Sequence, residues 1–428
     1  MIKHNGIVPL SIFIILQTNL LYANPFAYIT DFTNNQVYVV DTATNTQIKA
    51  IDVAGGPAGV AATHDGTRVY VTCRNDDTVK YIDTTTNTVI GSISITTGDP
   101  SNIAITPNDT TAYVVVSGPA GVIPIDIATS TAGAIISAPA LFFFQDIAIT
   151  SDGTMAYITA FRLAITPTFR LYPMAIPANT LGTFISVPVG TVPSESFLDI
   201  TPNNSFAYIS NSASGTVIPV NLGTATAAAE VATGSAVARE IRVAPNGNTV
   251  YVAVQVPDGM VPLDISATPS TPSVSPLVSA GTDSFGIDIT PTGSFAYVTN
   301  FSSSNMTPFN LASALAPSPG ANITLTTSSG GTASPFLLTI ISLPNITGTV
   351  KKNVFLNFTE CILTITWTAS TSSNIVSYNI YRGDTLIGNV LATNPSCFRT
   401  LFQCGVTYSV AAVNSSGTEG TRMPVEIV

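Results

Sequence analysis

The sequence predicts an all-β protein in which most of the chain is built from seven similar units. Three observations support this. A short block centred on a tyrosine recurs seven times, turn-forming dipeptides recur in phase with it, and only 9% of residues are charged although 45% are hydrophobic. Helices need Glu, Lys and Arg on their exposed faces. Ser, Thr, Asn, Gly and Pro fill the polar positions here, which is typical of short strands joined by tight turns.

The tyrosine blocks recur with the period of a propeller blade. Consecutive tyrosines are separated by 42, 43, 44, 51, 43 and 46 residues, and one four-stranded blade takes about 40–45 residues. The alternation of apolar and small polar residues in each block predicts a strand. The seven blocks are Ala27–Thr30, Val69–Thr72, Ala112–Val115, Ala156–Thr159, Ala207–Ser210, Val250–Ala253 and Ala296–Thr299.

Three further strands are predicted around each block. A turn such as Asp65-Gly66 lies about five residues before most of the tyrosines, and Asp-Gly supplies the positive φ that tight hairpins need. An apolar strand such as Ile103–Thr106 precedes the turn. A third strand such as Val79–Asp83 follows the block, and a weaker fourth strand is clearest at Val89–Ile95. Each unit is therefore a four-stranded antiparallel sheet.

The ends of the repeat array predict how the ring closes. The first unit begins at Tyr28 without a preceding strand, whereas the last unit is followed by the apolar segment Ser334–Ile341. Pairing of this segment with the first block removes two exposed sheet edges. We therefore expect six whole blades and one blade shared between the two ends of the array.

Proline predicts a difference between the blades. Proline cannot donate a hydrogen bond to a neighbouring strand, so it belongs at a sheet edge or a bulge. The first two units carry Val39 and Tyr81 in the third strand, where the later units carry proline. We expect the fourth strand of blades three to seven to be short or bulged at Pro124, Pro173, Pro219, Pro262 and Pro308.

These units resemble the YVTN β-propeller repeat family. The nearest copies are Tyr297-Val298-Thr299-Asn300 and the stretch from Val79 to Gly91. The resemblance covers about residues 25–342 and implies a seven-bladed β-propeller, for which we expect the boundaries 24–342. It does not imply one particular function.

The remaining residues, 343–428, resemble a fibronectin type III domain. Trp367, the only tryptophan of the chain, matches the core tryptophan of that family, and Tyr378–Arg382 matches its third strand. Tyr408–Asn414 matches the sixth strand, with Tyr408 as the tyrosine corner. The expected fold class is thus an all-β, seven-bladed β-propeller with a C-terminal fibronectin type III-like β-sandwich.

The first 23 residues are predicted to be a secretory signal peptide. Lys3 and His4 precede the apolar stretch Ile7–Leu16, and a cleavage site follows Ala23. No later run is long and apolar enough to span a bilayer, so we expect a secreted, periplasmic or cell-surface protein. Export allows disulfides, and the pairing among Cys361, Cys397 and Cys404 stays open.

The charge and the histidine content limit which partners and which chemistry are expected. The net charge of −10 repels phosphate backbones and disfavours nucleic acid. His64 is the only histidine after the signal peptide, and we interpret it as a turn residue. With one histidine, Ser-His-Asp chemistry is disfavoured, and we expect no cofactor.

Two alternatives remain open. Lactonase-like propellers resemble this repeat, and the resemblance implies a site of His or Arg with Glu in the central funnel. Asp199 and Asp288, in the innermost strands, are the acidic candidates for a cation or for acid–base chemistry. Asp76 and Asp77 are a second candidate pair for calcium. The further candidates are Arg74, Arg162, Arg170, Glu195, Arg239 and Glu240.

Together these observations predict a non-catalytic exported binding or scaffold protein. Its propeller loop faces are expected to hold a protein or glycan partner, because a rigid scaffold presents many loops there. The alternative is a lactonase-like propeller hydrolase that uses Asp199, Asp288 and a bound cation.

Overall fold

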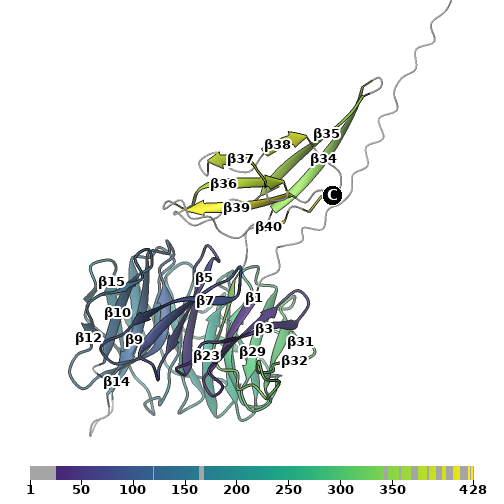
Figure 1. The fold of residues 1–428 in the computed structure, drawn as a ribbon. Helices are drawn as coiled ribbons and strands as arrows, with labels where there is room; N and C mark the ends of the chain where they lie inside the picture. The colour runs from purple at the N-terminus through teal and green to yellow at the C-terminus, as the bar shows by residue number, and fades with distance from the viewer. Residues whose placement is uncertain are drawn as a thin grey trace, which may run out of the picture.

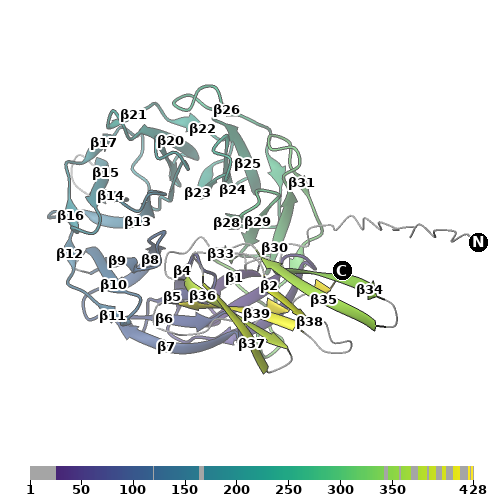
Figure 2. The same cartoon turned by 90° about the horizontal axis from the view of Figure 1, so that it is seen from above.

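The computed structural model is a seven-bladed β-propeller, as predicted. It describes residues 26–341, except 119 and 163–167, together with the strands β34–β41 of the C-terminal part. Seven sheets surround a central axis (Figures 1 and 2). All secondary-structure elements assigned in this described part are β-strands. The predicted signal peptide, residues 1–23, lies outside the described residues.

Each blade is an antiparallel sheet whose strands follow one another from the axis outward. The innermost strands form the wall of the central channel (Figure 2). They are β33 (Leu338–Ile341), β4 (Pro57–Ala62), β8 (Asp99–Ile105), β13 (Phe143–Ile149), β18 (Leu198–Ile200), β23 (Val237–Val243) and β28 (Ser284–Ile289).

The tyrosine blocks form the second strands, which are almost wholly buried because sheets pack on both of their faces. They are β1 (Phe26–Asp31), β5 (Arg68–Cys73), β9 (Thr111–Ser117), β14 (Met155–Arg162), β19 (Phe206–Asn211), β24 (Thr249–Gln255) and β29 (Phe295–Asn300). The third strands are β2 (Gln36–Asp41), β6 (Thr78–Asp83), β10 (Gly121–Asp126), β15 (Thr168–Ala175), β20 (Thr216–Asn221), β25 (Gly259–Asp264) and β30 (Asn305–Asn310).

The outer strands confirm the prediction from proline. Blades one and two have continuous outer strands, β3 (Thr46–Asp52) and β7 (Thr88–Ser94). In blade three, Pro124 of the third strand lies opposite the gap between the two short pieces. Its carbonyl accepts a hydrogen bond from the Gly133 N–H at 2.7 Å. The paired pieces of blades three to seven are β11 (Thr131–Ala132) and β12 (Ile136–Ser137), β16 (Thr180–Leu181) and β17 (Ile185–Val187), β21 (Thr226–Ala227) and β22 (Val231–Ala232), β26 (Ser273–Val274) and β27 (Val278–Ser279), and β31 (Ser318–Pro319) and β32 (Ile323–Thr324).

The ring closes as predicted. Strand β33, from the predicted segment Ser334–Ile341, pairs antiparallel with β1, with Leu338 opposite Ile29 and Ile341 opposite Phe26. The first blade therefore combines one strand from the end of the array with three from its start. This pairing joins the two ends of the 316-residue segment, so that neither β1 nor β33 is left without a strand partner.

A buried hydroxyl supports the innermost strand in five blades. The innermost strands of five blades carry a register shift of the β-bulge kind, as between Ser284 and Ile287. A bulge leaves a backbone amide without its ladder partner. Thr299 Oγ1 accepts the Gly286 amide at 2.8 Å and donates to the Phe336 carbonyl of the next blade at 2.6 Å. Thr72 and Thr159 accept the equivalent amide at two other bulges. Thr30 and Ser210 accept the amide directly before β33 and β18, which carry no register shift.

The tyrosine hydroxyls connect neighbouring blades. Tyr297, in blade seven, donates to the Thr42 carbonyl at 3.0 Å and to Asn45 Oδ1 at 2.9 Å, in the turn between the third and fourth strands of blade one. Tyr113 reaches Asn179 at 2.7 Å in the same way. The repeated Tyr-x-Thr pattern is thus explained by two buried polar contacts between blades, one for each side chain.

The C-terminal strands form two four-stranded sheets, in the orders β38-β35-β34-β41 and β37-β36-β39-β40. The strands predicted around Trp367, Tyr378 and Tyr408 lie in β35, β36 and β39. Cys397 and Cys404 lie outside the described residues. The strands are β34 (Ile346–Phe355), β35 (Phe358–Trp367), β36 (Ile375–Arg382), β37 (Thr385–Leu391), β38 (Phe398–Leu401), β39 (Tyr408–Asn414), β40 (Met423–Pro424) and β41 (Glu426–Ile427).

The role of the buried hydroxyl is testable with Thr299→Val, which keeps the shape of the side chain and removes its oxygen. The Gly286 amide and the Phe336 carbonyl then lose a buried partner, so the free energy of unfolding should fall by about 1–3 kcal/mol. Chemical denaturation measures it. Thr324→Val, at an exposed position of the same blade, should change it by less than about 0.5 kcal/mol. Equal effects of the two substitutions contradict this role.

Candidate functional site: the central channel

All seven innermost strands contribute to a cavity of about 260 Å³ in the central channel. Its lining is uneven around the ring. At the same repeat position, blades two to four carry Ala61, Ala104 and Ala148, whereas blades five to seven carry charged residues. Those residues are Asp199, Arg242 and Asp288. Asp146 and Glu240 join them from two residues before this repeat position, in blades four and six. The charge of the channel is therefore concentrated on one half of its wall.

The bulges explain how Asp146 and Glu240 come to line the channel. Each directly precedes the first residue after a register shift, at Ile147 and Ile241. A bulge places two residues opposite one, and this redirects the side chain next to it. Both carboxyl groups are buried, with Glu240 only 3% exposed.

The four carboxylates connect five successive innermost strands, from β13 of blade four to β33 of blade one. In every case one oxygen accepts a backbone amide from the following blade. The contacts are Leu198 N to Asp146 Oδ2 at 2.8 Å, Val243 N to Asp199 Oδ2 at 2.7 Å, Ile287 N to Glu240 Oε2 at 2.8 Å and Ile340 N to Asp288 Oδ2 at 2.8 Å.

The other four oxygens also have partners. Three accept the amide of the residue that follows their own, and the fourth belongs to an ion pair. These contacts are Ile147 N to Asp146 Oδ1 at 2.9 Å, Ile200 N to Asp199 Oδ1 at 2.8 Å, Ile289 N to Asp288 Oδ1 at 2.9 Å and Arg242 Nη2 to Glu240 Oε1 at 2.6 Å. All eight carboxylate oxygens therefore accept a hydrogen bond from the protein itself.

Arg242 is the one cation among the charged residues that line this cavity. Besides Glu240, its Nε lies 3.4 Å from Asp288 Oδ1. The surrounding carboxylates, Glu240 first, raise the pKa of Arg242 although burial lowers it. The guanidinium consequently stays charged and offsets part of the negative charge around it.

Burial governs the protonation of the carboxyl groups. It raises the pKa of Asp146 to about 6 and that of Glu240 to about 8, against the lowering effects of backbone amides and Arg242. Burial also raises the pKa of Asp199 and of Asp288. Clustered groups with raised pKa values are found in active sites, but structural ion-pair networks produce them as well.

Aromatic rings and a chain of polar contacts lie near the starts of several innermost strands. The Phe285 ring packs against Phe336, tilted by 31° with ring centroids 4.2 Å apart, and meets Phe197 edge-on at 5.8 Å. The Arg239 guanidinium lies 4.8 Å from the Phe285 centroid and pairs with Glu195 and with Gln255. Arg239 and Glu195, both predicted candidates, are thus brought together there rather than inside the cavity.

The other predicted residues lie in different places. His64 borders the cavity, but its Nδ1 contacts Asp109 Oδ1 at 3.1 Å, and the same carboxylate caps the backbone amides of His64 and Asp65. This agrees with a turn residue. Asp76 and Asp77 lie in the β5–β6 hairpin, where Asp76 pairs with Lys80 at 3.3 Å. Arg74 is exposed beside them.

Sequence reasoning placed Asp199 and Asp288 correctly in the innermost strands but missed Arg242 and Asp146. Arg242 occupies the same repeat position as the two aspartates, so aligning the units could have found it. Asp146 could not be found in this way, because its orientation depends on the bulge. Glu240 was among the candidates from the sequence, but its place in the innermost strand of blade six was not predicted.

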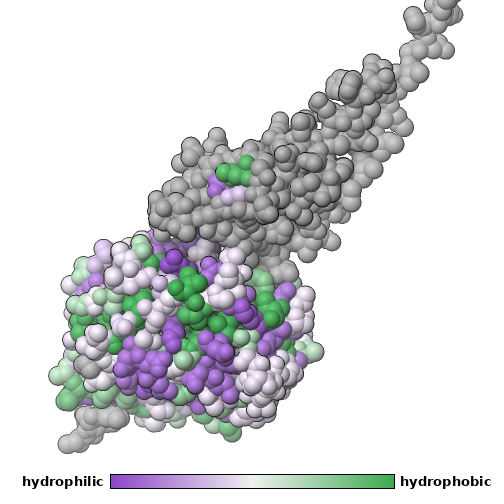
Figure 3. Space-filling model, in the orientation of Figure 1, coloured by the Kyte–Doolittle hydropathy of each residue, from purple (hydrophilic) through white to green (hydrophobic). Residues whose placement is uncertain are grey.

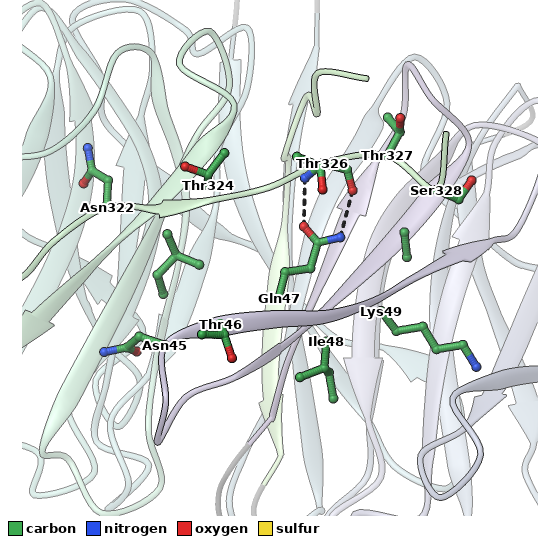
Figure 4. A pocket seen from close by; sticks show the side chains of 12 residues that line it. Asn45, Thr46, Gln47, Ile48, Lys49, Asn322, Thr324, Thr326, Thr327 and Ser328 are labelled. Atoms are coloured by element: carbon green, nitrogen blue, oxygen red, sulfur yellow. Dashed lines mark hydrogen bonds between the residues drawn. The ribbon is translucent and has the colours of Figure 1, made fainter. Parts of the chain in front are cut away.

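A second hollow, of about 530 Å³, lies at the junction of blades seven and one (Figure 4). It runs between β3 and residues 322–328. The Gln47 side-chain amide crosses it, donating to the Thr326 carbonyl and accepting from the Thr326 N–H, both at 2.8 Å. The amide thus imitates the paired hydrogen bonds of a neighbouring strand. We interpret this contact as part of the ring closure.

Two kinds of feature are absent from the described part of the chain. No group of three or more His, Cys, Asp or Glu side chains is arranged to hold a metal ion. No helix with the length and apolarity of a membrane span is found in that part of the chain.

The raised pKa values predict that the protein is more stable at pH 5 than at pH 8. A carboxyl group whose pKa is raised by folding binds more protons in the folded state. Its stabilising contribution is complete below the unfolded value of about 4 and is lost as the pH rises through about 6 for Asp146 and about 8 for Glu240. The unfolding midpoint should therefore fall from pH 5 to pH 8, as measured by circular dichroism.

Glu240→Gln should remove the part of this decline that lies between pH 6 and pH 8. Asp264→Asn is the matched control. Hydrogen bonds from Ser266 lower the pKa of Asp264, so its contribution changes only in more acidic solution. A wild-type midpoint that is flat over this range, or the same decline in Glu240→Gln, contradicts the prediction.

Removing the cation gives the complementary test. In Arg242→Met, Glu240 and Asp288 lose their buried counter-charge, and breaking such a pair costs about 3–5 kcal/mol. The loss should be largest at pH 8 and smaller at pH 5, where protonation relieves the carboxylates. Urea denaturation at the two pH values measures the difference. A loss that does not depend on pH rules out a charge effect.

Comparison with known proteins shows the fold alone. No protein-family model and no curated protein matches the sequence. The chain is similar in structure to a protein of unknown function from Desulfotomaculum acetoxidans (TM-score 0.60, 18% identity, 74% of this chain and 99% of that one). It is also similar to a candidate 6-phosphogluconolactonase from Bacteroides fragilis (0.61, 18%, 75% and 98%) and to a periplasmic gluconolactonase from Pseudomonas aeruginosa (0.60, 16%, 75% and 99%). The chain thus shares the propeller fold of these proteins.

Proposed function

We propose that this chain is a non-catalytic binding protein. The observation that carries the proposal is the use of the channel carboxylates: all eight oxygens accept hydrogen bonds from the protein, and four of them hold adjacent blades together. A general base must be within hydrogen-bonding reach of a substrate proton, whereas these carboxylate oxygens already accept hydrogen bonds from the protein. A cavity of about 260 Å³ is also smaller than the roughly 300–1,000 Å³ of ordinary ligand pockets.

The face that carries the hairpins between second and third strands supports a role in recognition. In a blade these hairpins lie on the same face as the starts of the innermost strands. Phe32, Leu141, Phe143 and Val256 are apolar and at least one-third exposed there, with Leu141 at 71% and Val256 at 70%. Leu141 and Val256 also have positive φ values of 69° and 57°. Such strain clusters at functional sites.

The side wall of the propeller is a mixed surface, with apolar residues in patches between polar ones (Figure 3). On the hairpin face, the exposed apolar residues are those named above. Exposed apolar groups rimmed by polar residues mark interaction sites. We therefore place the partner, a protein or a glycan, on the hairpin face.

Export and the C-terminal part complete the proposal. The charged start and apolar stretch of the first 23 residues support a secreted, periplasmic or cell-surface location. The YVTN resemblance and the resemblance of residues 343–428 to a fibronectin type III domain suit a modular surface protein, with the C-terminal part as spacer or second contact. The charge of −10 makes nucleic acid a poor partner.

A lactonase-like hydrolase is the second candidate function. The acidic cluster with raised pKa values favours it, and two of the similar structures are described as lactonases. In this case Asp199 and Asp288 are the acid–base groups, assisted by a cation such as calcium. Asp76 and Asp77 are the second calcium candidates.

A substrate assay with an active-site variant separates the two functions. Hydrolysis of glucono-δ-lactone and of 6-phosphogluconolactone is measured with and without Ca²⁺, for wild type and for the double variant Asp199→Asn/Asp288→Asn. We expect wild type to be no faster than the variant. A wild-type rate at least about tenfold higher corresponds to about 1.4 kcal/mol of transition-state stabilisation and overturns the non-catalytic proposal.

A further inference from the structure

Two arginines converge on one aromatic ring in blade four. The guanidinium carbon of Arg162 lies 5.6 Å from the centroid of Phe142, and that of Arg170 lies 4.3 Å from the same centroid. Arg170 also lies 3.6 Å from the centroid of Phe184, so it contacts two rings. Its Nη1 donates to the Tyr172 hydroxyl at 3.1 Å. Two like charges are thus held near one another.

No carboxylate balances these charges within the described residues. None of the ion pairs found there includes Arg162 or Arg170. The sequence from Gly153 to Ser194 contains no Asp and no Glu. Aromatic rings attract a guanidinium but carry no net charge, so they do not cancel the mutual repulsion. A chain with a net charge of −10 therefore has a local cationic region on blade four.

Exposed apolar side chains lie on blade four as well, and one of them, Phe184, contacts Arg170. Leu141 is 71% exposed, Phe143 43% and Phe184 38%. Phe143 stacks on Phe161 with centroids 5.4 Å apart, which fixes the orientation of its ring. The positive φ of Leu141, 69°, is unfavourable for a residue with a side chain, so the fold holds an apolar group in solvent at a cost. Phe143 and Phe161 lie on the opposite face of the sheet from the arginines, so we call Leu141, Phe142, Arg162, Arg170 and Phe184 the blade-four patch.

We infer that the blade-four patch binds an acidic segment of a protein partner, in which carboxylates alternate with apolar or aromatic side chains. The inference rests on the proposed binding function and specifies its partner. Planar guanidinium groups match carboxylates in geometry and charge. The exposed Leu and Phe side chains provide contacts for the apolar residues between them.

The composition of the patch favours a peptide over other anions. Sugars need several hydrogen-bonding side chains, and the exposed members at the rim of this patch are Leu and Phe. Long phosphate backbones are repelled by the acidic remainder of the surface. A short acidic segment needs only the local cationic region, because charges more than about 8–10 Å away are largely screened at physiological ionic strength.

The test is a selection from a random-peptide library displayed on phage against the purified chain. Enriched peptides are synthesised with a fluorescent label and measured by anisotropy. We expect Asp and Glu to be enriched beside Phe and Leu. The double variant Arg162→Gln/Arg170→Gln should weaken binding at least about tenfold, and Arg74→Gln, an exposed arginine of blade two, should leave it unchanged.

Leu141→Gly separates binding from folding. Glycine accepts the positive φ at this position, so the unfolding midpoint should stay the same or rise while peptide affinity falls severalfold. The inference is overturned if enriched peptides lack acidic residues, if the double arginine variant still folds and binds them as wild type does, or if heparin or single-stranded DNA binds the patch more tightly than the peptides. Peptides that bind equally well to the arginine variant leave the binding function standing and refute only this location.

Discussion

The propeller depends on where the unpaired amide of each innermost strand finds an acceptor. Buried amides without a partner are costly, and the bulged strands around the channel would contain several. The hydroxyl of Thr or Ser in the second strand accepts this amide in five blades, as Thr299 does for Gly286. At one of these bulges Thr159 accepts the Asp146 amide, and the Asp146 side chain turns toward the axis. Glu240 does the same at the bulge of blade six, where Ala253 stands in place of the hydroxyl residue. Part of the charged channel is therefore a consequence of local backbone irregularities.

Much of the fold could be predicted from the sequence because it repeats. The tyrosine period, the Asp-Gly and Asn-Gly turns and the apolar segment before residue 342 predicted seven blades and the way they close. The prolines of the third strands predicted the broken outer strands. Each of these features acts locally, on a turn, on a strand edge or through the N–H that proline lacks. Its effect can therefore be recognised within a single unit.

The site was less predictable because it is assembled across blades. Asp199 and Asp288 stood out where other units carry Ala, but their partners, Val243 and Ile340, belong to the next blade. Asp146 lies two residues before Ala148, the position that the repeat assigns to the channel wall. Sequence periodicity predicts the average blade, whereas this cluster arises from the departures of individual blades from that average.

The channel and the hairpin face differ in what their polar groups do. In the channel, charged side chains have partners within the chain, and their effect is to hold neighbouring blades. On the hairpin face, apolar residues such as Leu141 are held in solvent on strained backbone. The central cluster is thus explained by stability, and the exposed residues of the periphery are not.

The broken outer strands have a consequence for self-association. An exposed strand edge can template the addition of another chain. Proline divides this edge into short pieces in five blades, so only β3 and β7, on adjacent blades, are continuous for seven residues. A second copy that joined the propeller rim by strand addition would find a continuous edge only at β3 or β7. The proline pattern thus restricts edge-to-edge pairing on the propeller to one sector of its rim.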